Sequence, residues 1–188
     1  MRCFIAIDID PQIRQAIVDL QRQIADRCAL GSQDVKWVDK DAMHVTLKFL
    51  GQVPDQDVVD LCRVTERVAA AHHRFDLAIG SMGHFGRPAT VLWVGTGRGT
   101  EELISLQADL EGQLEAAGWP REKRRFTAHM TICRVKNLRV SAQLLRAYKP
   151  FMEIELGSTP VDELVVYQSQ LRPEGPLYTA MGRYELQI

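Results

Sequence analysis

A four-residue pattern, His-apolar-Thr-apolar, occurs twice in this 188-residue chain and constrains its fold more than any other feature. The copies are residues 44–47 (His-Val-Thr-Leu) and residues 129–132 (His-Met-Thr-Ile), 85 residues apart. Each lies in a segment that reads as a β-strand, and each follows an amphipathic helix and a polar loop. The repetition indicates two copies of one structural unit, although the rest of the two halves shows no clear identity.

Each copy predicts a His and a Thr side by side on one face of a strand. Residues i and i+2 of a strand point to the same face, about 6–7 Å apart. In residues 44–50, strict alternation places His44, Thr46 and Lys48 on one face, and Val45, Leu47 and Phe49 on the other. If the two strands are neighbours, two imidazoles and two hydroxyls converge on one place.

The remaining sequence predicts more strands than helices. Asp10 is expected to cap a helix over residues 11–28, and further helices are expected from Pro54 to about Val68 and over residues 100–117 and 141–148. Besides residues 44–50, strands are expected over residues 2–8, 35–38, 75–79, 91–94, 128–133, 151–156, 163–168 and 178–186, with a loop at 83–88 and a turn at 173–176. Because the helices do not alternate strictly with the strands, an α+β fold is favoured over a doubly wound sheet.

Composition limits the partners of the chain. A formal net charge of −1 leaves no basic bias, so contact with nucleic acid should be local, at a short end or a single phosphate. Four cysteines without a CxxC pair, no secretory signal and no apolar run of membrane-spanning length predict free thiols in a reducing cytoplasm. The length predicts one domain of two lobes over residues 1–188, and nothing demands more than a monomer.

Two histidines and two threonines suit the hydrolysis of a phosphodiester without a metal. One imidazole accepts a proton from the attacking water, and the other donates a proton to the departing sugar oxygen. The hydroxyls of Thr46 and Thr131 can hold the non-bridging oxygens as charge rearranges. A cyclic phosphate at a strand end is a small anion that needs a tight pocket, which agrees with the near-neutral net charge.

The two segments together resemble the signature of the two-histidine (2H) phosphoesterase superfamily. A closer resemblance, to the bacterial RNA 2′,3′-cyclic phosphodiesterases once called 2′-5′ RNA ligases, covers almost the whole chain. It is carried by residues 2–7, 44–51, 83–88, 91–95, 129–134 and 182–184. The second motif includes the arginine of that family, Arg134, five residues after its histidine.

The resemblance implies a bilobal α+β fold with two antiparallel sheets, pseudo-twofold symmetry around a central cleft, and helices outside. It implies opening of an RNA 2′,3′-cyclic phosphate to a 2′-phosphomonoester with no metal and no other cofactor. One histidine is then the general acid and the other the general base. We assign the proton donor to His44 and the acceptor to His129, a choice that the sequence does not decide.

Three further residues are expected to contact the substrate. Arg134 is expected to bind the phosphate, although strict alternation would turn it away from His129, so a bulge or the end of the strand must turn it back. Lys48, on the expected face of His44, is a weaker candidate for the same anion. Phe85, in the expected loop 83–88, either stacks on a base or packs.

Other functions compete with this interpretation. A metallohydrolase could use His129, Cys133 and His44, but four residues along a strand span about 13 Å, too far for one ion. A module that binds RNA ends without catalysis would need a defect that the sequence does not reveal. The reverse reaction, 2′-5′ ligation to a 5′-hydroxyl, would use the same two histidines, and hydrolysis should dominate because water is far more concentrated than RNA ends.

Overall fold

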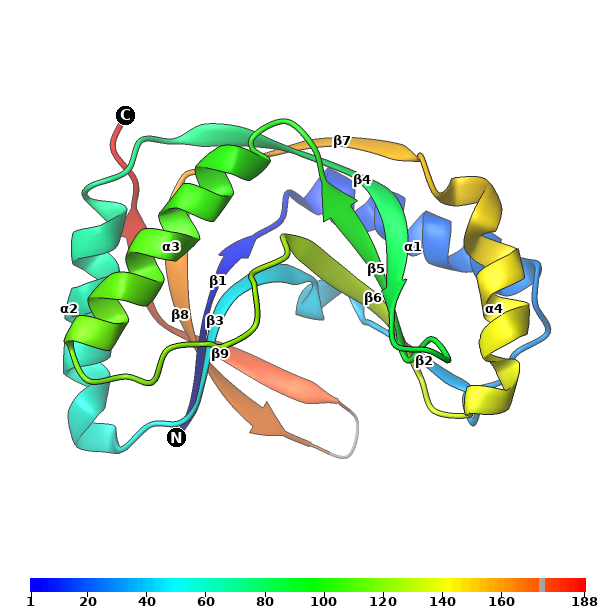
Figure 1. Cartoon of the computed structure of the whole chain (residues 1–188), viewed down its shortest axis with the longest axis horizontal. Helices are drawn as coiled ribbons and strands as arrows, with labels where there is room; N and C mark the ends of the chain where they lie inside the picture. Colours follow the sequence, from blue (N-terminus) through cyan, green and yellow to red (C-terminus); the bar gives the residue numbers. More distant parts are fainter. Residues whose placement is uncertain (173–174) are drawn as a thin grey trace.

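The computed structural model describes residues 1–172 and 175–188, and in them the strands form two antiparallel sheets (Figure 1). One sheet has the order β3 (His44–Gln52), β1 (Arg2–Asp8), β8 (Glu163–Leu171), β9 (Pro176–Glu185). The other has the order β2 (Val35–Trp37), β6 (His129–Val135), β5 (Val91–Thr96), β4 (Phe75–Phe85), β7 (Glu155–Val161). The predicted α+β class is confirmed, whereas the turn predicted at 173–176 includes residues 173–174, which lie outside the described part.

The two strands that carry the His-x-Thr segments hold equivalent places. β3 is an edge strand of one sheet. β6 holds the corresponding position in the other sheet, where only the three-residue strand β2 lies outside it. Each is antiparallel to its neighbour, β1 or β5, and β3 and β6 contact each other between the sheets. The sequence repeat therefore corresponds to a repeat in the sheet topology.

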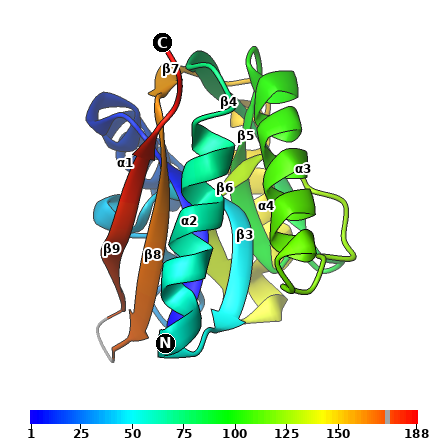
Figure 2. The same cartoon turned by 90° about the vertical axis from the view of Figure 1, so that its left-hand side faces the viewer.

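Helices cover the sheets in two pairs at opposite ends of the molecule (Figures 1 and 2). α2 (Val58–Ala69) and α3 (Thr100–Ala116) pack together, with α2 against β8 and β9 and α3 against β3. α1 (Pro11–Asp26) and α4 (Ser141–Tyr148) pack together on the other side, with α1 against β7. Short 3-10 turns are η1 (Lys40–Ala42), η2 (Asp55–Asp57), η3 (Leu138–Val140) and η4 (Lys149–Phe151).

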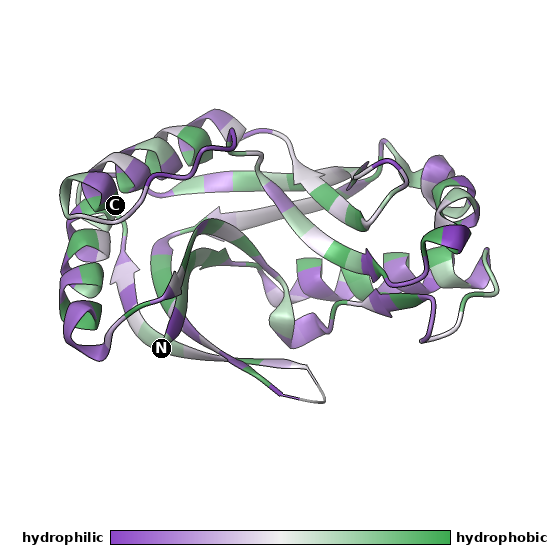
Figure 3. Ribbon diagram, turned by 60° about the horizontal axis from the view of Figure 1, so that its bottom comes forward, coloured by the Kyte–Doolittle hydropathy of each residue, from purple (hydrophilic) through white to green (hydrophobic). Residues whose placement is uncertain are grey.

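The core explains why these segments fold as they do. Asp10 caps α1 as predicted, because its Oδ1 accepts from the amide of Gln12 at 2.7 Å. The helical stripes of α1 and α3, including Leu20 and Leu106, are fully buried against the sheets, and each such side chain contributes about 1.5–3 kcal/mol. In Figure 3 the hydrophobic residues gather on the strands and on the helix faces turned toward them.

Two strands and one helix differ most clearly from their predicted bounds, and most other elements differ by a few residues at their ends. β4 continues to Phe85 through the predicted loop, because residues 83–85 pair with β5, and glycines at 80 and 83 had hidden that strand character. Residues 151–156 contain the end of η4 and only the start of β7, which runs on to Val161 and tolerates Pro160 because it is an edge strand. The second helix starts later, with η2 preceding Val58.

Candidate active site

An extra residue in β3 decides which of its side chains reach the site. Opposite β1, Thr46 and Lys48 pair with consecutive residues, so Leu47 is a bulge. A bulge reverses the alternation that follows it. His44 and Thr46 therefore share one face of the sheet, Lys48 turns to the other, and Phe49 returns to the face of His44.

The second motif carries a bulge at the same place. Opposite β5, Thr131 and Cys133 pair with consecutive residues, so Ile132 is the extra one. Arg134 is thereby turned back to the face of His129 and Thr131. The bulge that a phosphate contact by Arg134 requires is therefore present. Cys133 lies on the opposite face of the strand and cannot bind one metal ion together with His129.

A buried glutamine holds each bulge. Gln21 of α1 donates to the carbonyl of Ile132 at 2.9 Å, and Gln107 of α3 donates to the carbonyl of Leu47 at 3.4 Å. Both glutamines are almost fully buried. Because a buried donor or acceptor without a partner costs roughly 1–3 kcal/mol, these bonds stabilise the bulged register in both strands.

His44 lies in an aromatic environment. The ring of Phe4 stacks on it with centroids 4.8 Å apart, and Tyr178 meets it edge-on at 5.2 Å. Burial lowers the pKa of His44 to about 4, and a backbone hydrogen bond to Ala42 and the charge of Asp8 oppose that shift only in part. The imidazole is therefore neutral at pH 7 in the free protein.

His129 is oriented by its backbone and by two rings. Its Nδ1 lies 2.6 Å from the carbonyl oxygen of Thr127, and because a carbonyl only accepts, Nδ1 carries the proton. In the neutral form of the ring, Nε2 then has the lone pair and can accept a proton. Phe85 packs edge-on against the ring at 4.8 Å, and Trp93 lies at 6.3 Å.

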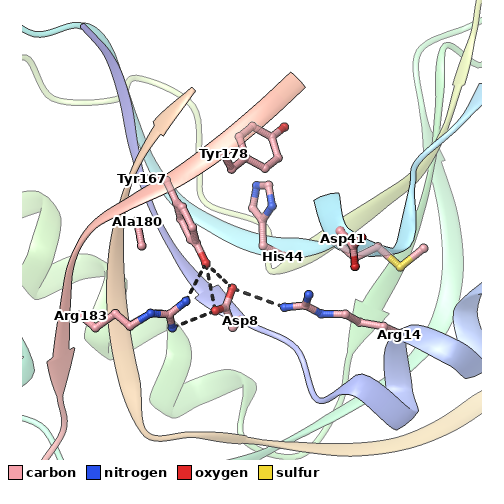
Figure 4. A pocket seen from close by; sticks show the side chains of 9 residues that line it. Asp8, Arg14, Asp41, His44, Tyr167, Tyr178, Ala180 and Arg183 are labelled. Carbon is pink, nitrogen blue, oxygen red and sulfur yellow. Dashed lines mark hydrogen bonds and ion pairs between the residues drawn. The ribbon is translucent and has the colours of Figure 1, made fainter. Parts of the chain in front are cut away.

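A cavity of about 250 Å³ opens beside His44 (Figure 4). Asp8, directly opposite His44 in the ladder, accepts from the hydroxyl of Tyr167 at 2.7 Å and from Arg183 at 3.1 Å, and Arg14 lies 3.5 Å away. The cavity is lined by Asp8, Arg14, Asp41, Met43, His44, Tyr167, Tyr178, Ala180 and Arg183. Sequence reasoning missed this network, because only the register of β1 against β3 and β8 brings its members together.

Tyr178 connects the surroundings of the two motifs. Its ring lies against His44, and burial raises the pKa of its phenol while the nearby charges of Arg134 and Arg2 oppose the shift. A side chain from β9 thus lies within reach of both His44 in β3 and Arg134 in β6.

Thr46 and Thr131 lie on the same face as the histidine of their strand, as predicted, whereas Lys48 does not. Thr46 and Thr131 are half-buried, and in the described residues neither hydroxyl has a hydrogen-bond partner, so both can bind a ligand oxygen. Lys48 is buried on the other face, with Nζ 2.5 Å from Glu111 Oε1 and 2.7 Å from the carbonyl of Pro120. The prediction that Lys48 shares the face of His44 is wrong, because the bulge at Leu47 reverses the alternation.

Other features bear on partners and compartment. All four cysteines lie in the described residues and are free thiols. Over residues 1–172 and 175–188, no group of three or more His, Cys, Asp and Glu side chains has the geometry of a metal site. In the same residues, no helix combines the length and the apolar character needed to cross a membrane.

The two sheets and the paired His-x-Thr strands define a 2H phosphoesterase-like architecture. Two solved structures share it: a Thermus thermophilus protein (TM-score 0.80, 24% identity, covering 100% of this chain and 98% of that one) and E. coli LigT in complex with 3′-AMP (TM-score 0.77, 26% identity, 98% and 97%). At 24% identity, the similarity to the Thermus thermophilus protein supports the fold alone.

The sequence comparisons then fix the family. The model of the 2′-5′ RNA ligase superfamily matches residues 9–172, and the chain belongs to this superfamily. A Thermotoga maritima protein named RNA 2′,3′-cyclic phosphodiesterase is 31% identical over 190 aligned residues, covering 100% of this chain and 96% of that protein. The family suggested by the sequence motifs is thus confirmed.

Proposed function

We propose that the protein is an RNA 2′,3′-cyclic phosphodiesterase, which hydrolyses the cyclic phosphate at an RNA end to a 2′-phosphomonoester. The observation that carries this proposal is the pair of equivalent strands, each presenting a histidine and a threonine whose hydroxyl has no hydrogen-bond partner among residues 1–172 and 175–188. Relatives that bear this enzyme name over nearly the full length of the chain support it.

The chemistry follows from the residues. Water attacks phosphorus, Nε2 of His129 takes a proton from that water, and the bond from phosphorus to O3′ breaks. His44 gives a proton to O3′, so a 3′-hydroxyl and a 2′-phosphate are formed. Thr46, Thr131 and Arg134 bind the non-bridging oxygens, where charge develops in the transition state.

The role of donor requires that His44 gain a proton in the complex. The free imidazole is neutral because of burial, but an anion placed beside it favours the charged form. The cyclic phosphate therefore raises the pKa of His44 when it binds. With Nδ1–H held by Thr127, the neutral ring of His129 presents Nε2 as a proton acceptor. His44 makes an equivalent backbone hydrogen bond to Ala42, so the two rings differ in their burial rather than in this hydrogen bond.

The partner in this proposal is the end of an RNA, and one chain is the active unit. The free thiols favour the cytoplasm. No cofactor takes part. The same residues would catalyse ligation in reverse if a 5′-hydroxyl took the place of water.

The test is to incubate the protein, with EDTA present, with an RNA oligonucleotide that ends in a 2′,3′-cyclic phosphate. Chromatography against 2′- and 3′-phosphate standards identifies the product. We expect a 2′-phosphate end. A 3′-phosphate end, or activity that disappears in EDTA and returns with zinc, would contradict the proposal.

A further inference from the structure

Asp8 ends strand β1 directly opposite His44. Side chains that are opposite each other in an antiparallel ladder point to the same face of the sheet, with Cβ atoms about 4.5–5.5 Å apart. The carboxylate of Asp8 therefore lies beside the imidazole, and both side chains line the same cavity (Figure 4). The hydrolysis described above does not use this carboxylate.

Three side chains hold the carboxylate of Asp8 in place. The hydroxyl of Tyr167 donates to it, with its oxygen 2.7 and 2.9 Å from the two Oδ atoms. Arg183, which also pairs with Glu163, donates to Oδ2 at 3.1 Å, and Arg14 comes within 3.5 Å of Oδ1 from the other side (Figure 4). Burial, together with the hydrogen bond to Asp8, raises the pKa of Tyr167 to about 12, so the phenol keeps its proton and remains a donor near neutral pH.

His44 needs a negative charge nearby if it is to become protonated. Burial among rings disfavours the imidazolium and lowers the pKa of His44 to about 4. The carboxylate of Asp8 acts against this effect, and the guanidinium of Arg14 adds to it. The titratable and charged groups around His44 come from the elements packed about it: Asp8 of β1, Arg14 of α1, Asp41 of η1, Tyr167 of β8, Tyr178 and Arg183 of β9, and Arg134 of β6 near Tyr178.

We propose that Asp8 is a positioning residue for the proton donor, and that its fixed negative charge lets the buried imidazole of His44 take up the proton that it gives to O3′. Tyr167 and Arg183 contribute through Asp8, because they hold its carboxylate beside the ring. The inference rests on the proposed function, in which His44 is the donor. The substrate anion and Asp8 then act together, since each favours the imidazolium.

The direct test is the pKa of His44, read by NMR titration of histidine-labelled protein in complex with adenosine 2′-monophosphate. Asp8→Asn removes the charge, while its amide oxygen can still accept from Tyr167. We expect the pKa of His44 to fall by about one unit. Arg14→Met removes the opposing charge, so the pKa should rise. Glu163→Gln, which removes the other carboxylate paired with Arg183, is the matched control and should leave the pKa of His44 unchanged.

Kinetics show whether the charge acts through His44. With a lower pKa, less of the donor is protonated, so Asp8→Asn should lower kcat at pH 8 on the order of tenfold, and less at pH 5. In the His129→Ala background, Asp8→Asn should lower the residual rate again, whereas in the His44→Ala background it should have no further effect. Asp8→Glu keeps the charge and should recover most of the wild-type kcat.

Thermal melting reports whether each variant folds. If Asp8→Asn does not fold cooperatively, Asp8→Ser, which is smaller and also neutral, takes its place with the same expectations. The inference is overturned if the neutral variant leaves the pKa of His44 unchanged. It is also overturned if the neutral variant slows His44→Ala as much as it slows the wild type.

Failure of the proposed function is distinguishable from failure of this inference. If the wild type turns over no RNA cyclic phosphate, the proposed function fails. NMR titration of the free protein then tests the inference alone, because it needs neither substrate nor turnover. A lower pKa of His44 in the neutral variant than in the wild type would support the role of Asp8, and equal values would overturn it.

Discussion

His44 and His129 lie in different surroundings, and that difference separates their proposed roles. His44 is packed among aromatic rings, and burial lowers its pKa to about 4. His129 is fixed by a hydrogen bond from Nδ1 to Thr127, with Nε2 free. A bell-shaped rate profile would not reveal which histidine is the acid, because both assignments need one proton shared between the two groups.

The residual activity of His129→Ala does reveal it. In that variant, His44 is the only one of the two motif histidines that remains. The pH dependence of the residual rate therefore shows whether His44 acts as an acid or as a base. A proton donor is active only when protonated, and we expect the residual kcat to fall as pH rises from 5 to 8. The measurement is a single-turnover rate at each pH, with His44→Ala as the matched variant. A residual rate that rises with pH would make His44 the base.

At the scale of the secondary-structure elements, the bulges decide which side chains of the two motif strands share a face. Gln21→Leu removes the side-chain donor from Ile132, and we expect the free energy of unfolding to fall by roughly 1–3 kcal/mol. Because Arg134 depends on that bulge, KM for the cyclic phosphate should rise as well. Urea unfolding and initial rates measure both, with the exposed Gln23→Leu of the same helix as control. A loss of stability with unchanged KM would show that the bulge does not position Arg134.

The buried pair of Lys48 and Glu111 links β3 to α3 and to the segment before β6. Lys48→Met leaves the buried charge of Glu111 without its ion-pair partner, with only the amide of Glu122 still donating to Oε1, and we expect a loss of about 3–5 kcal/mol in urea unfolding. The double variant Lys48→Met with Glu111→Leu should recover most of that loss. If the double variant is as unstable as the single one, the cost lies in packing rather than in charge.

The strand bulges and the register between strands are the features that could not be predicted from this sequence. Periodicity predicted most strands and helices, and the repeat predicted that the histidine and the threonine of each motif share one face of their strand. Alternation failed at Lys48 and Phe49, because a bulge is set by partners distant in sequence, such as Gln107 on α3. Asp8, Tyr167 and Tyr178 were missed for a similar reason, since only strand register brings them to His44.

At the scale of the whole molecule, the near-neutral charge limits how RNA is bound. A formal net charge of −1, with Arg134 on the same face of β6 as His129, fits contact with one or two phosphates. We expect log kcat/KM to fall with log salt with a slope no steeper than about −2. A dinucleotide and a 20-mer with the same cyclic end should react at similar rates. A slope near −5, or a strong preference for the longer RNA, would indicate an extended binding surface.

The central claim is that both histidines perform the chemistry, and single-turnover rates of wild type, His44→Ala, His129→Ala and the double variant in EDTA test it most directly. We expect each single variant to lose on the order of 10²–10⁴ in rate while its melting curve stays cooperative. The double variant should lose less than the product of the two losses, because the residues act as a unit. A folded single variant that retains the wild-type rate would contradict the two-histidine mechanism.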